Sequence, residues 1–251
     1  MTKGLSDKIL MYEELSMNAH PASQTQFYDG WVLRFANGYT KRANSVNPLY
    51  QHTIDLNEKI MRCEEKYAKQ GLPTIFKLTD GSDPVIDKAL EARNYITDDP
   101  AYVMDMDLHD RFTMPKEIVL TDHADEEWLN AYFSFSAYSD PASMSAARRI
   151  LENVKNKMVC ARIVKDNVTV ACGSSVIERG YVSLLNIVVE QARRGEGYGA
   201  QICGSLLAAA TRSGARTAFL QVGRTNHVAI GMYRKLGFDV AYSYWYRVKK
   251  M

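Results

Sequence analysis

The feature that most constrains this chain is a short strand pattern that runs into a glycine-rich turn and then into a helix. Residues 184–189 are mostly aliphatic and β-branched, which is the composition of a buried strand. The turn carries Gly195, Gly197 and Gly199, and the apolar residues after it recur at helical spacing. The glycines therefore stand at a helix start, where unpaired N–H groups and partial positive charge favour an anion such as a phosphate.

Three phosphate-binding patterns compete for this turn. A P-loop needs a lysine directly after its last glycine, and none follows here. A dinucleotide fingerprint needs G-x-G-x-x-G and an acidic residue about twenty positions on. The three glycines are spaced differently, and no Asp or Glu occurs between Ala200 and Phe238. The third pattern, R-x-x-G-x-G, fits at Arg194, Gly197 and Gly199.

A second pattern follows the helix. Residues 217–222 are typical of a strand, and residues 226–236 of a short helix with Asn226 as its N-cap and Gly237 at its end. GNAT proteins carry N-x-x-A-x-x-x-Y-x-x-x-G-F at this point, matched here by Asn226, Ala229, Tyr233, Gly237 and Phe238. With both patterns in the right order, the chain resembles the GNAT superfamily of acyl-CoA N-acyltransferases. It departs from the family at Gln191, where proline is frequent.

The resemblance implies acetyl-CoA as co-substrate and no metal. It implies that the backbone of Val189 holds the oxyanion and that Tyr233 protonates the leaving thiolate. The residues expected to bind the cofactor are Ile187, Val188, Val189, Arg193, Arg194, Gly195, Glu196, Gly197, Tyr198, Gly199, Ala200, Asn226, Ala229 and Tyr233. Taken alone, Tyr233 is also explained as a core aromatic of an amphipathic helix, and the two arginines as solvated surface.

The general base is left open by the sequence. The candidates are Glu178, Glu190 and His227, and each is also explained as a structural or solvated residue. Many family members place a carboxylate early on the strand before the loop, where this chain has Ser183. A water-relayed proton or an acceptor amine of low pKa would remove the need for a direct side-chain base.

The order of elements in the first half of the chain repeats that of the second half. A helix at 55–70, a strand at 74–78, a helix at 83–93 and a strand at 102–108 follow one another. An offset of 143 residues, which pairs Thr74 with Thr217, also pairs Phe76 with Phe219 without gaps. At this offset the three loop glycines are matched by His52, Ile54 and Leu56, so the first copy lacks the cofactor loop.

We therefore expect an α/β (α+β) protein of two tandem GNAT-like folds. Each is a mixed, mostly antiparallel twisted sheet flanked by helices. Residues 1–114 form a degenerate N-terminal copy, and residues 115–251 form the copy with the acetyl-CoA site.

The stretch 29–50 also resembles the N-terminal segment of a two-domain GNAT subgroup. It predicts two strands, 31–36 and 40–46, joined by a turn at Asn37-Gly38. Polar and aromatic residues on this hairpin either face the acceptor or belong to an amphipathic edge: Trp31, Arg34, Arg42 and Asn44.

Charge and cysteine content narrow the partners and the compartment. The net charge of +2 gives no strong field for nucleic acid or a membrane surface. The four cysteines show no C-x-x-C or Cys/His spacing, so we expect buried free thiols in a reducing compartment. No apolar run is long enough for a membrane span, and the N-terminus does not resemble a signal peptide, so we expect a cytoplasmic protein.

Two functions follow from these patterns. The first is an N-acetyltransferase that moves an acetyl group from acetyl-CoA to a primary amine of a small molecule or peptide by direct attack, either as a monomer or as a homodimer. The second is an acyl-CoA-binding regulatory or scaffold protein without turnover.

Overall fold

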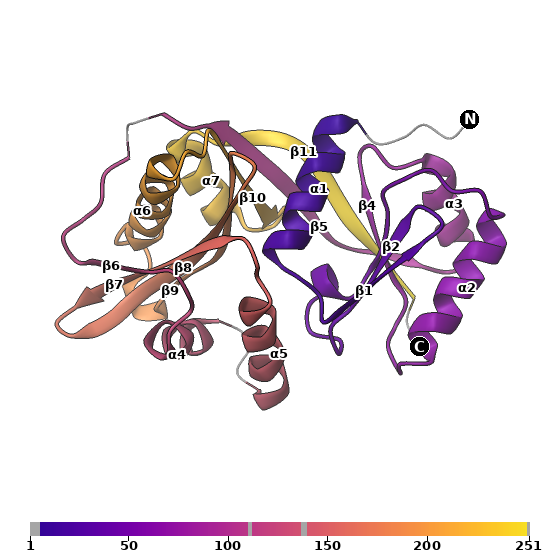
Figure 1. Ribbon diagram of the computed structural model, residues 1–251, viewed down its shortest axis with the longest axis horizontal. Helices are drawn as coiled ribbons and strands as arrows, with labels where there is room; N and C mark the ends of the chain where they lie inside the picture. The colour runs from indigo at the N-terminus through magenta and orange to yellow at the C-terminus, as the bar shows by residue number, and fades with distance from the viewer. Residues whose placement is uncertain (1–5, 110–111, 137–139, 250–251) are drawn as a thin grey trace. The chain divides into compact units, whose positions relative to one another are not determined.

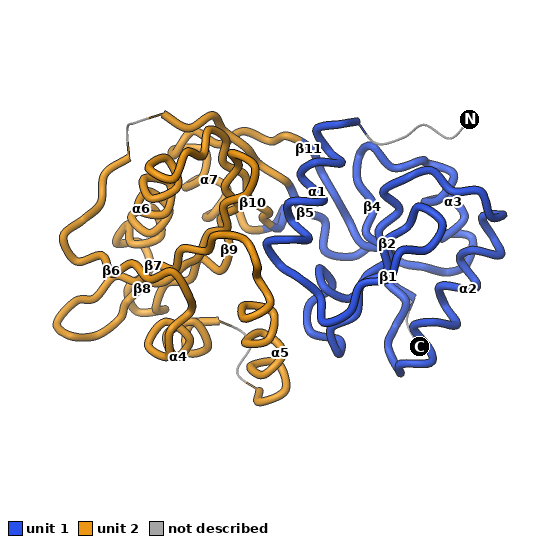
Figure 2. Tube along the Cα trace, viewed as in Figure 1, with its two compact units in different colours: residues 1–102, 223–225, 242–251 blue, residues 103–222, 226–241 orange. Residues whose placement is uncertain are grey.

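The computed structural model describes residues 6–109, 112–136 and 140–249. The chain forms two compact units, shown in different colours in Figure 2. Unit 1 comprises residues 1–102, 223–225 and 242–251, and unit 2 comprises residues 103–222 and 226–241. The expected domains 1–114 and 115–251 divide the chain at a single point, whereas unit 1 also takes residues 223–225 and 242–251 from the C-terminal half. That residues 1–114 and 115–251 are two separate domains stays a prediction.

Unit 1 is a β-sheet flanked by helices (Figure 1). Its strand order is β1-β2-β3-β4-β11. The strands are β1 (Gln24–Tyr28), β2 (Trp31–Phe35), β3 (Val46–Pro48), β4 (Ile75–Thr79) and β11 (Asp239–Val248), of which Tyr244–Val248 pairs antiparallel with β4. The helices are α1 (Asp7–Ala19), α2 (Leu56–Ala68) and α3 (Pro84–Ala92).

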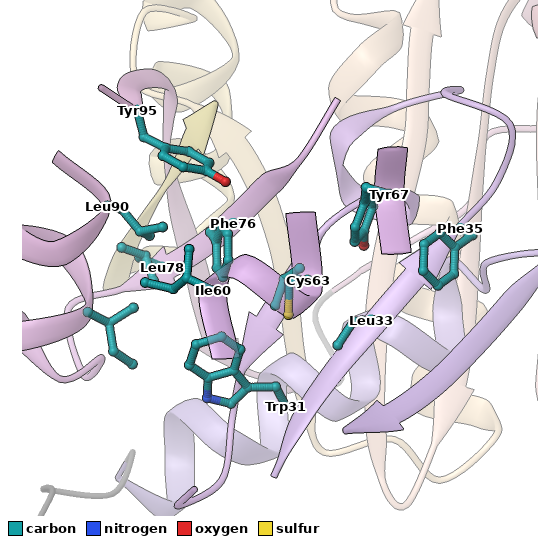
Figure 3. Packing of buried hydrophobic residues seen from close by; sticks show 12 residues of the cluster. Trp31, Leu33, Phe35, Ile60, Cys63, Tyr67, Phe76, Leu78, Leu90 and Tyr95 are labelled. Atoms are coloured by element: carbon teal, nitrogen blue, oxygen red, sulfur yellow. The ribbon is translucent and has the colours of Figure 1, made fainter. Parts of the chain in front are cut away.

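The core of unit 1 forms where α2 packs its apolar face on the sheet (Figure 3). Ile60, Cys63 and Tyr67 recur at helical spacing and are fully buried. The ring of Tyr67 lies 4.6 Å from that of Phe35, and its hydroxyl donates to the carbonyl of Arg34 at 2.9 Å.

Unit 1 also contains a buried ion pair. Lys77 Nζ lies 2.6 Å from Glu13 Oε2, and both side chains are almost fully buried. The hydroxyl of Tyr242 donates to the other carboxylate oxygen of Glu13 at 2.8 Å. Each buried charge is therefore compensated by its partner inside the unit. Removal of one partner would leave the other charge buried and unpaired.

The predicted strand at 40–46 is wrong. Residues Lys41–Ala43 form a short 3-10 helix (η1), and the partner strand of β2 is β3. The cause is Asn44, whose side chain accepts from the backbone N–H groups of Ala36 and Gly38 at 2.7 and 3.0 Å. It also donates to the carbonyls of Tyr39 and Thr40, so it satisfies the backbone locally and competes with a strand ladder.

Arg34 is likewise turned inward. Its guanidinium is buried and donates to the backbone carbonyl of Arg42 at 2.6 Å and to that of His20. It therefore holds the end of α1 to the segment after β2, which is a structural role.

Unit 2 has the strand order β5-β10-β9-β8-β7-β6. The strands are β5 (Ile96–Asp107), β6 (Ile118–Thr121), β7 (Lys157–Lys165), β8 (Val168–Glu178), β9 (Tyr181–Val189) and β10 (Thr217–Gly223). The helices are α4 (Glu126–Phe135), α5 (Pro141–Glu152), α6 (Tyr198–Arg212) and α7 (His227–Leu236). Among the helices that the structure describes, none has the length and apolar character needed to cross a bilayer.

The proposed repeat is visible in the element bounds. α2, β4 and α3 correspond to α6, β10 and α7 at the offset of 143 residues, to within about one residue at each end. The start of β5 likewise corresponds to the start of β11 at this offset. Both of these strands are shared between the units. β5 begins in unit 1 and ends in unit 2, whereas β11 begins in unit 2 and ends in unit 1.

The expected architecture is confirmed. Of the strand pairs with a described register, β3 with β4 and β9 with β10 are parallel, and the others are antiparallel.

Candidate active site

The site is built where β9 separates from its parallel neighbour β10. Described pairing joins Tyr181–Leu184 of β9 to Thr217–Leu220 of β10 and goes no further, although β9 continues to Val189. Between residues 185 and 189 the backbone edge that faces β10 therefore lacks a β10 partner in the described part of the chain. Such an edge can accept the amides of an extended ligand.

A β-bulge on the other side of β9 accompanies this separation. Cys172 pairs with Val188 and Ser174 pairs with Leu185, so Asn186 and Ile187 together oppose the single residue Gly173. Asn186 adopts a φ of 56°, in the left-handed region that asparagine tolerates better than most residues. A bulge of this kind bends the strand and increases its twist.

The bulge is held by a side chain from α4 and by a bond from its own Asn186 to β8. The indole N–H of Trp128, on α4, donates to the carbonyl of Gly173 at 2.9 Å. The side-chain amide of Asn186 donates to Ser174 Oγ at 3.1 Å. A Cβ at position 173 would lie 2.6 Å from Ile187 Cδ1 and 2.7 Å from Ile202 Cγ2, so any other residue would displace these side chains. The sequence pattern did not predict these contacts, and the one signal that it carries is the polar Asn186 inside an apolar strand.

The loop after β9 presents an open helix start. A 3-10 turn (η2, Gln191–Arg193) leads to Gly195 and Gly197, whose φ values of 87° and 85° favour glycine. Gly197 is the N-cap of α6, and no side chain caps this helix. A Cβ at Gly195 or Gly197 would meet open space, so a ligand can approach the backbone closely. The first amides of α6 are thus suited to an anion.

The two arginines lie on this loop. Arg193 donates to Glu196 at 3.0 Å and to the hydroxyl of Tyr198 at 2.9 Å. Arg194 Nε lies 3.4 Å from the carbonyl oxygen of Val189. Exposed pairs of this kind are weak, so the Arg193 side chain can exchange Glu196 for a bound phosphate at little cost.

Three elements of the site meet at Gly199. A Cβ there would lie 3.1 Å from Met232 Sδ on α7 and 3.7 Å from Val189 Cγ2 at the end of β9. The predicted caps of α7 are confirmed. Asn226 accepts from the N–H of Ala229 at 3.1 Å, and Gly237 ends the helix with a φ of 102°. The two patterns found in the sequence are therefore adjacent in space.

Tyr233 lies on α7 and is 7% exposed, with its ring 6.0 Å from that of Phe238. Burial, followed by the nearby Cys203, raises the pKa of the Tyr233 phenol well above its usual range. The raised pKa keeps the hydroxyl protonated near neutral pH, so Tyr233 can donate a proton and is not available as a base there. The remaining predicted contacts near the loop, Ile187, Val188 and Ala200, are half-buried.

The candidate bases occupy different places. Glu178 accepts from Asn156 at 2.8 Å and lies at the β8–β9 hairpin, the end of β9 away from the loop. Glu190 follows β9 directly and is half-buried, and His227 is exposed at the start of α7. Ser183 is buried on β9, so a carboxylate is absent from that position.

No group of three or more metal-ligating side chains occurs among the residues that the structure places. All four cysteines are buried free thiols, as predicted.

A strand that opens at a bulge, followed by an uncapped glycine-rich helix start and a tyrosine-bearing helix, is the arrangement that the sequence resemblance to the GNAT acyl-CoA N-acyltransferases implies. Residues 7–247 match the family model described as "Probable histone acetyltransferase Rv0428c C-terminal". The chain belongs to this family, and it is an acyltransferase.

Relatives and solved structures agree with this assignment. The "Uncharacterized N-acetyltransferase YobR" of Bacillus subtilis is 28% identical over 255 residues, which cover 97% of this chain and all of the relative. A GCN5-related N-acetyltransferase from Kribbella flavida has a TM-score of 0.71 at 13% identity, over 99% of this chain and 96% of that one. A tandem GNAT protein from the clavulanic acid biosynthesis pathway has a TM-score of 0.64 at 14% identity, over 87% and 77%. At these identities the two structures establish the tandem GNAT fold alone.

Proposed function

We propose that the protein is an N-acetyltransferase that transfers the acetyl group of acetyl-CoA to a primary amine by direct attack. The observation that carries this proposal is the start of α6. Gly197 caps the helix in the left-handed conformation without any side-chain acceptor, beside the end of β9 after its pairing with β10 has stopped. A diphosphate would satisfy these amides, and a pantetheine arm would occupy the open edge of β9.

Most of the predicted contacts have a role in this scheme. The amides of residues 195–199 bind the diphosphate, with Arg193 and Arg194 adding charge-assisted hydrogen bonds. The backbone of Ile187 to Val189 pairs with the amide groups of the pantetheine arm. Asn226 fixes the start of α7 and lines the same arm.

The chemistry then needs few groups. The amine nitrogen attacks the thioester carbon, a C–N bond forms, and negative charge develops on the carbonyl oxygen, where the N–H of Val189 stabilises it. The C–S bond breaks and the thiolate takes the proton of Tyr233. The attacking neutral amine loses one proton when the amide forms, and this proton passes through water to the Tyr233 phenolate and restores the phenol. No carboxylate is needed for this relay, which fits the serine at position 183.

The acceptor is a primary amine of a small molecule or peptide. The description of the matching family names a histone acetyltransferase, so a lysine side chain belongs in the panel of amines that is tested. We place the reaction in the cytoplasm, since the four buried cysteines are free thiols.

Calorimetric titration with acetyl-CoA tests the cofactor site. Gly197→Glu puts a carboxylate and a strained backbone at the helix start, and we expect binding to weaken at least about tenfold. Gly214→Glu is the matched control, because Gly214 has a φ of 84°, meets open space and lies just beyond the other end of α6. Equal binding by wild type and Gly197→Glu would refute the assignment of the loop.

Thiol release against a panel of amines tests the acid. Tyr233→Phe should lower kcat by roughly 10²–10⁴-fold with little change in acetyl-CoA affinity. Tyr95→Phe removes another partly buried hydroxyl, one that donates to Glu64 in unit 1, and should leave kcat unchanged. Full kcat in Tyr233→Phe would exclude this residue as the proton donor.

A further inference from the structure

The N-terminal repeat has its own counterpart of the cofactor loop. At the offset of 143 residues, Thr53 and Ile54 correspond to Glu196 and Gly197, and both segments lead into a helix, α2 or α6. The loop before α2 has no glycine, yet its backbone amides converge on an anion supplied by the chain itself.

That anion is the carboxylate of Asp29. Its oxygens accept from the N–H of Thr53 at 2.9 and 3.1 Å, from the Thr53 hydroxyl at 2.9 Å and from the N–H of Ile54 at 3.0 Å. Lys59 Nζ, on α2, lies 2.9 Å from Asp29 Oδ2. Two amides, a hydroxyl and an ammonium are the donors with which proteins hold a phosphate.

The sequence places this carboxylate with a tight turn. Asp29 and Gly30 form the two-residue connection between β1 and β2, with φ values of 45° and 82°. A Cβ on Gly30 would lie 2.0 Å from the carbonyl oxygen of Gln51, so glycine is required for this approach. The N–H of Tyr50 donates to the carbonyl of Gly30 at 2.9 Å. The turn is thereby fixed to the segment that precedes α2.

The electrostatics agree with a filled anion site. The amide of Ile54, followed by Lys59, holds the pKa of Asp29 well below its usual range. The Lys59 side chain is fully buried, with its ammonium 4.3 Å from the ring centre of Trp31. Burial lowers the pKa of Lys59, and Asp29 opposes that shift.

The two repeats thus differ in what meets the equivalent amides. In unit 1 the Asp29 carboxylate accepts hydrogen bonds from the backbone amides of the loop before α2. The Asp55 side chain caps α2 by accepting from the amides of Asn57 and Glu58 at 3.0 and 3.1 Å. In unit 2 the N-cap of α6 is Gly197, and no side chain accepts from the helix start.

We propose that Asp29 is a built-in substitute for a cofactor phosphate, so that unit 1 keeps the anion cradle of the repeat, fills it itself and leaves the chain with one acyl-CoA site. The comparison with α6 rests on the proposed function. The latent ligand of the cradle is inorganic phosphate or a phosphate monoester.

Phosphate rescue tests this proposal. Asp29→Gly keeps a turn that allows positive φ and removes the carboxylate, and it is made in a Gly197→Glu background to close the site on α6. In potassium chloride this variant should have a lower Tm than its parent. Inorganic phosphate at matched ionic strength should restore at least about half of the loss in a saturable way, and should leave the Tm of the parent unchanged.

A matched control separates rescue from a general salt effect. Asp83→Gly removes the N-cap carboxylate of α3, which accepts from Val85 at 2.9 Å elsewhere in unit 1, and phosphate should not rescue it. If Asp29→Gly does not fold in chloride, recovery of its helical signal on addition of phosphate replaces Tm as the readout. Equal effects of phosphate on both variants, an unchanged Tm in Asp29→Gly or no recovery would overturn the proposal. Failure of acetyl-CoA to bind wild type would instead count against the proposed function.

Discussion

The variant Trp128→Phe tests whether the bulge in β9 shapes the proposed acyl-CoA site. The indole is 1% exposed and its N–H meets the carbonyl of Gly173 at 2.9 Å. Phenylalanine keeps an aromatic ring against Tyr132, whose ring centre lies 5.2 Å from that of Trp128. The substitution therefore removes one buried donor and part of a ring while the packing partner stays in place.

The magnitude follows from these two losses. A buried carbonyl without its donor costs about 1–3 kcal/mol. The volume lost between indole and phenyl adds on the order of 1 kcal/mol. At about 2–4 °C for each kcal/mol in a chain of this size, Tm should fall by roughly 4–16 °C.

Ligand binding gives the second readout, because a loosened bulge no longer holds the open edge of β9. We expect the Kd for acetyl-CoA from calorimetry to rise at least about threefold in Trp128→Phe. Trp245→Phe is the control, since its indole donates to Asp87 at 3.1 Å and that carboxylate keeps two bonds to Arg247 at 2.8 and 2.9 Å. A lower Tm with an unchanged Kd would show that the hydrogen bond stabilises the unit without shaping the site.

Three further outcomes are expected. Gly173→Ala, whose Cβ would lie 2.6 Å from Ile187 Cδ1, should lower the free energy of unfolding by about 1–3 kcal/mol in denaturant titration, whereas Gly223→Ala, which meets open space, should not. Lys77→Met leaves Glu13 buried without its cation and should cost about 3–5 kcal/mol, a loss that pairing it with Glu13→Gln should reduce. Burial raises the pKa of every cysteine thiol, to about 12 for Cys63, so iodoacetamide at pH 8 should label the native protein far more slowly than the unfolded one.

Local signals predicted much of unit 2. The caps of α7 could be predicted from the sequence because Asn226 and Gly237 form hydrogen bonds at the ends of their own helix. The strand β9, which precedes the loop, could be predicted because its apolar run ends at a glycine-rich turn. Agreement at these positions reflects interactions within a few residues of each other.

Features that depend on residues far apart in the sequence could not be predicted from local patterns. Asn186 interrupts a strand, but the indole that holds the bulge comes from α4, and it bonds a residue 45 positions along the chain. The strand at 40–46 failed because the side chain of Asn44 satisfied the backbone that a ladder would have used. Periodicity also does not specify strand partners, so the sharing of β5 and β11 between units was not foreseen.

That sharing has a consequence for synthesis. β4 pairs with residues 244–248, which the ribosome adds long after residues 75–79. At roughly 5–20 residues per second, the nascent β4 waits on the order of ten seconds for this partner. During that time it presents an open strand edge, a template for pairing with another chain. The first unit to be synthesised is therefore among the last parts to be completed, and any product interrupted before residue 244 would carry an unfinished sheet.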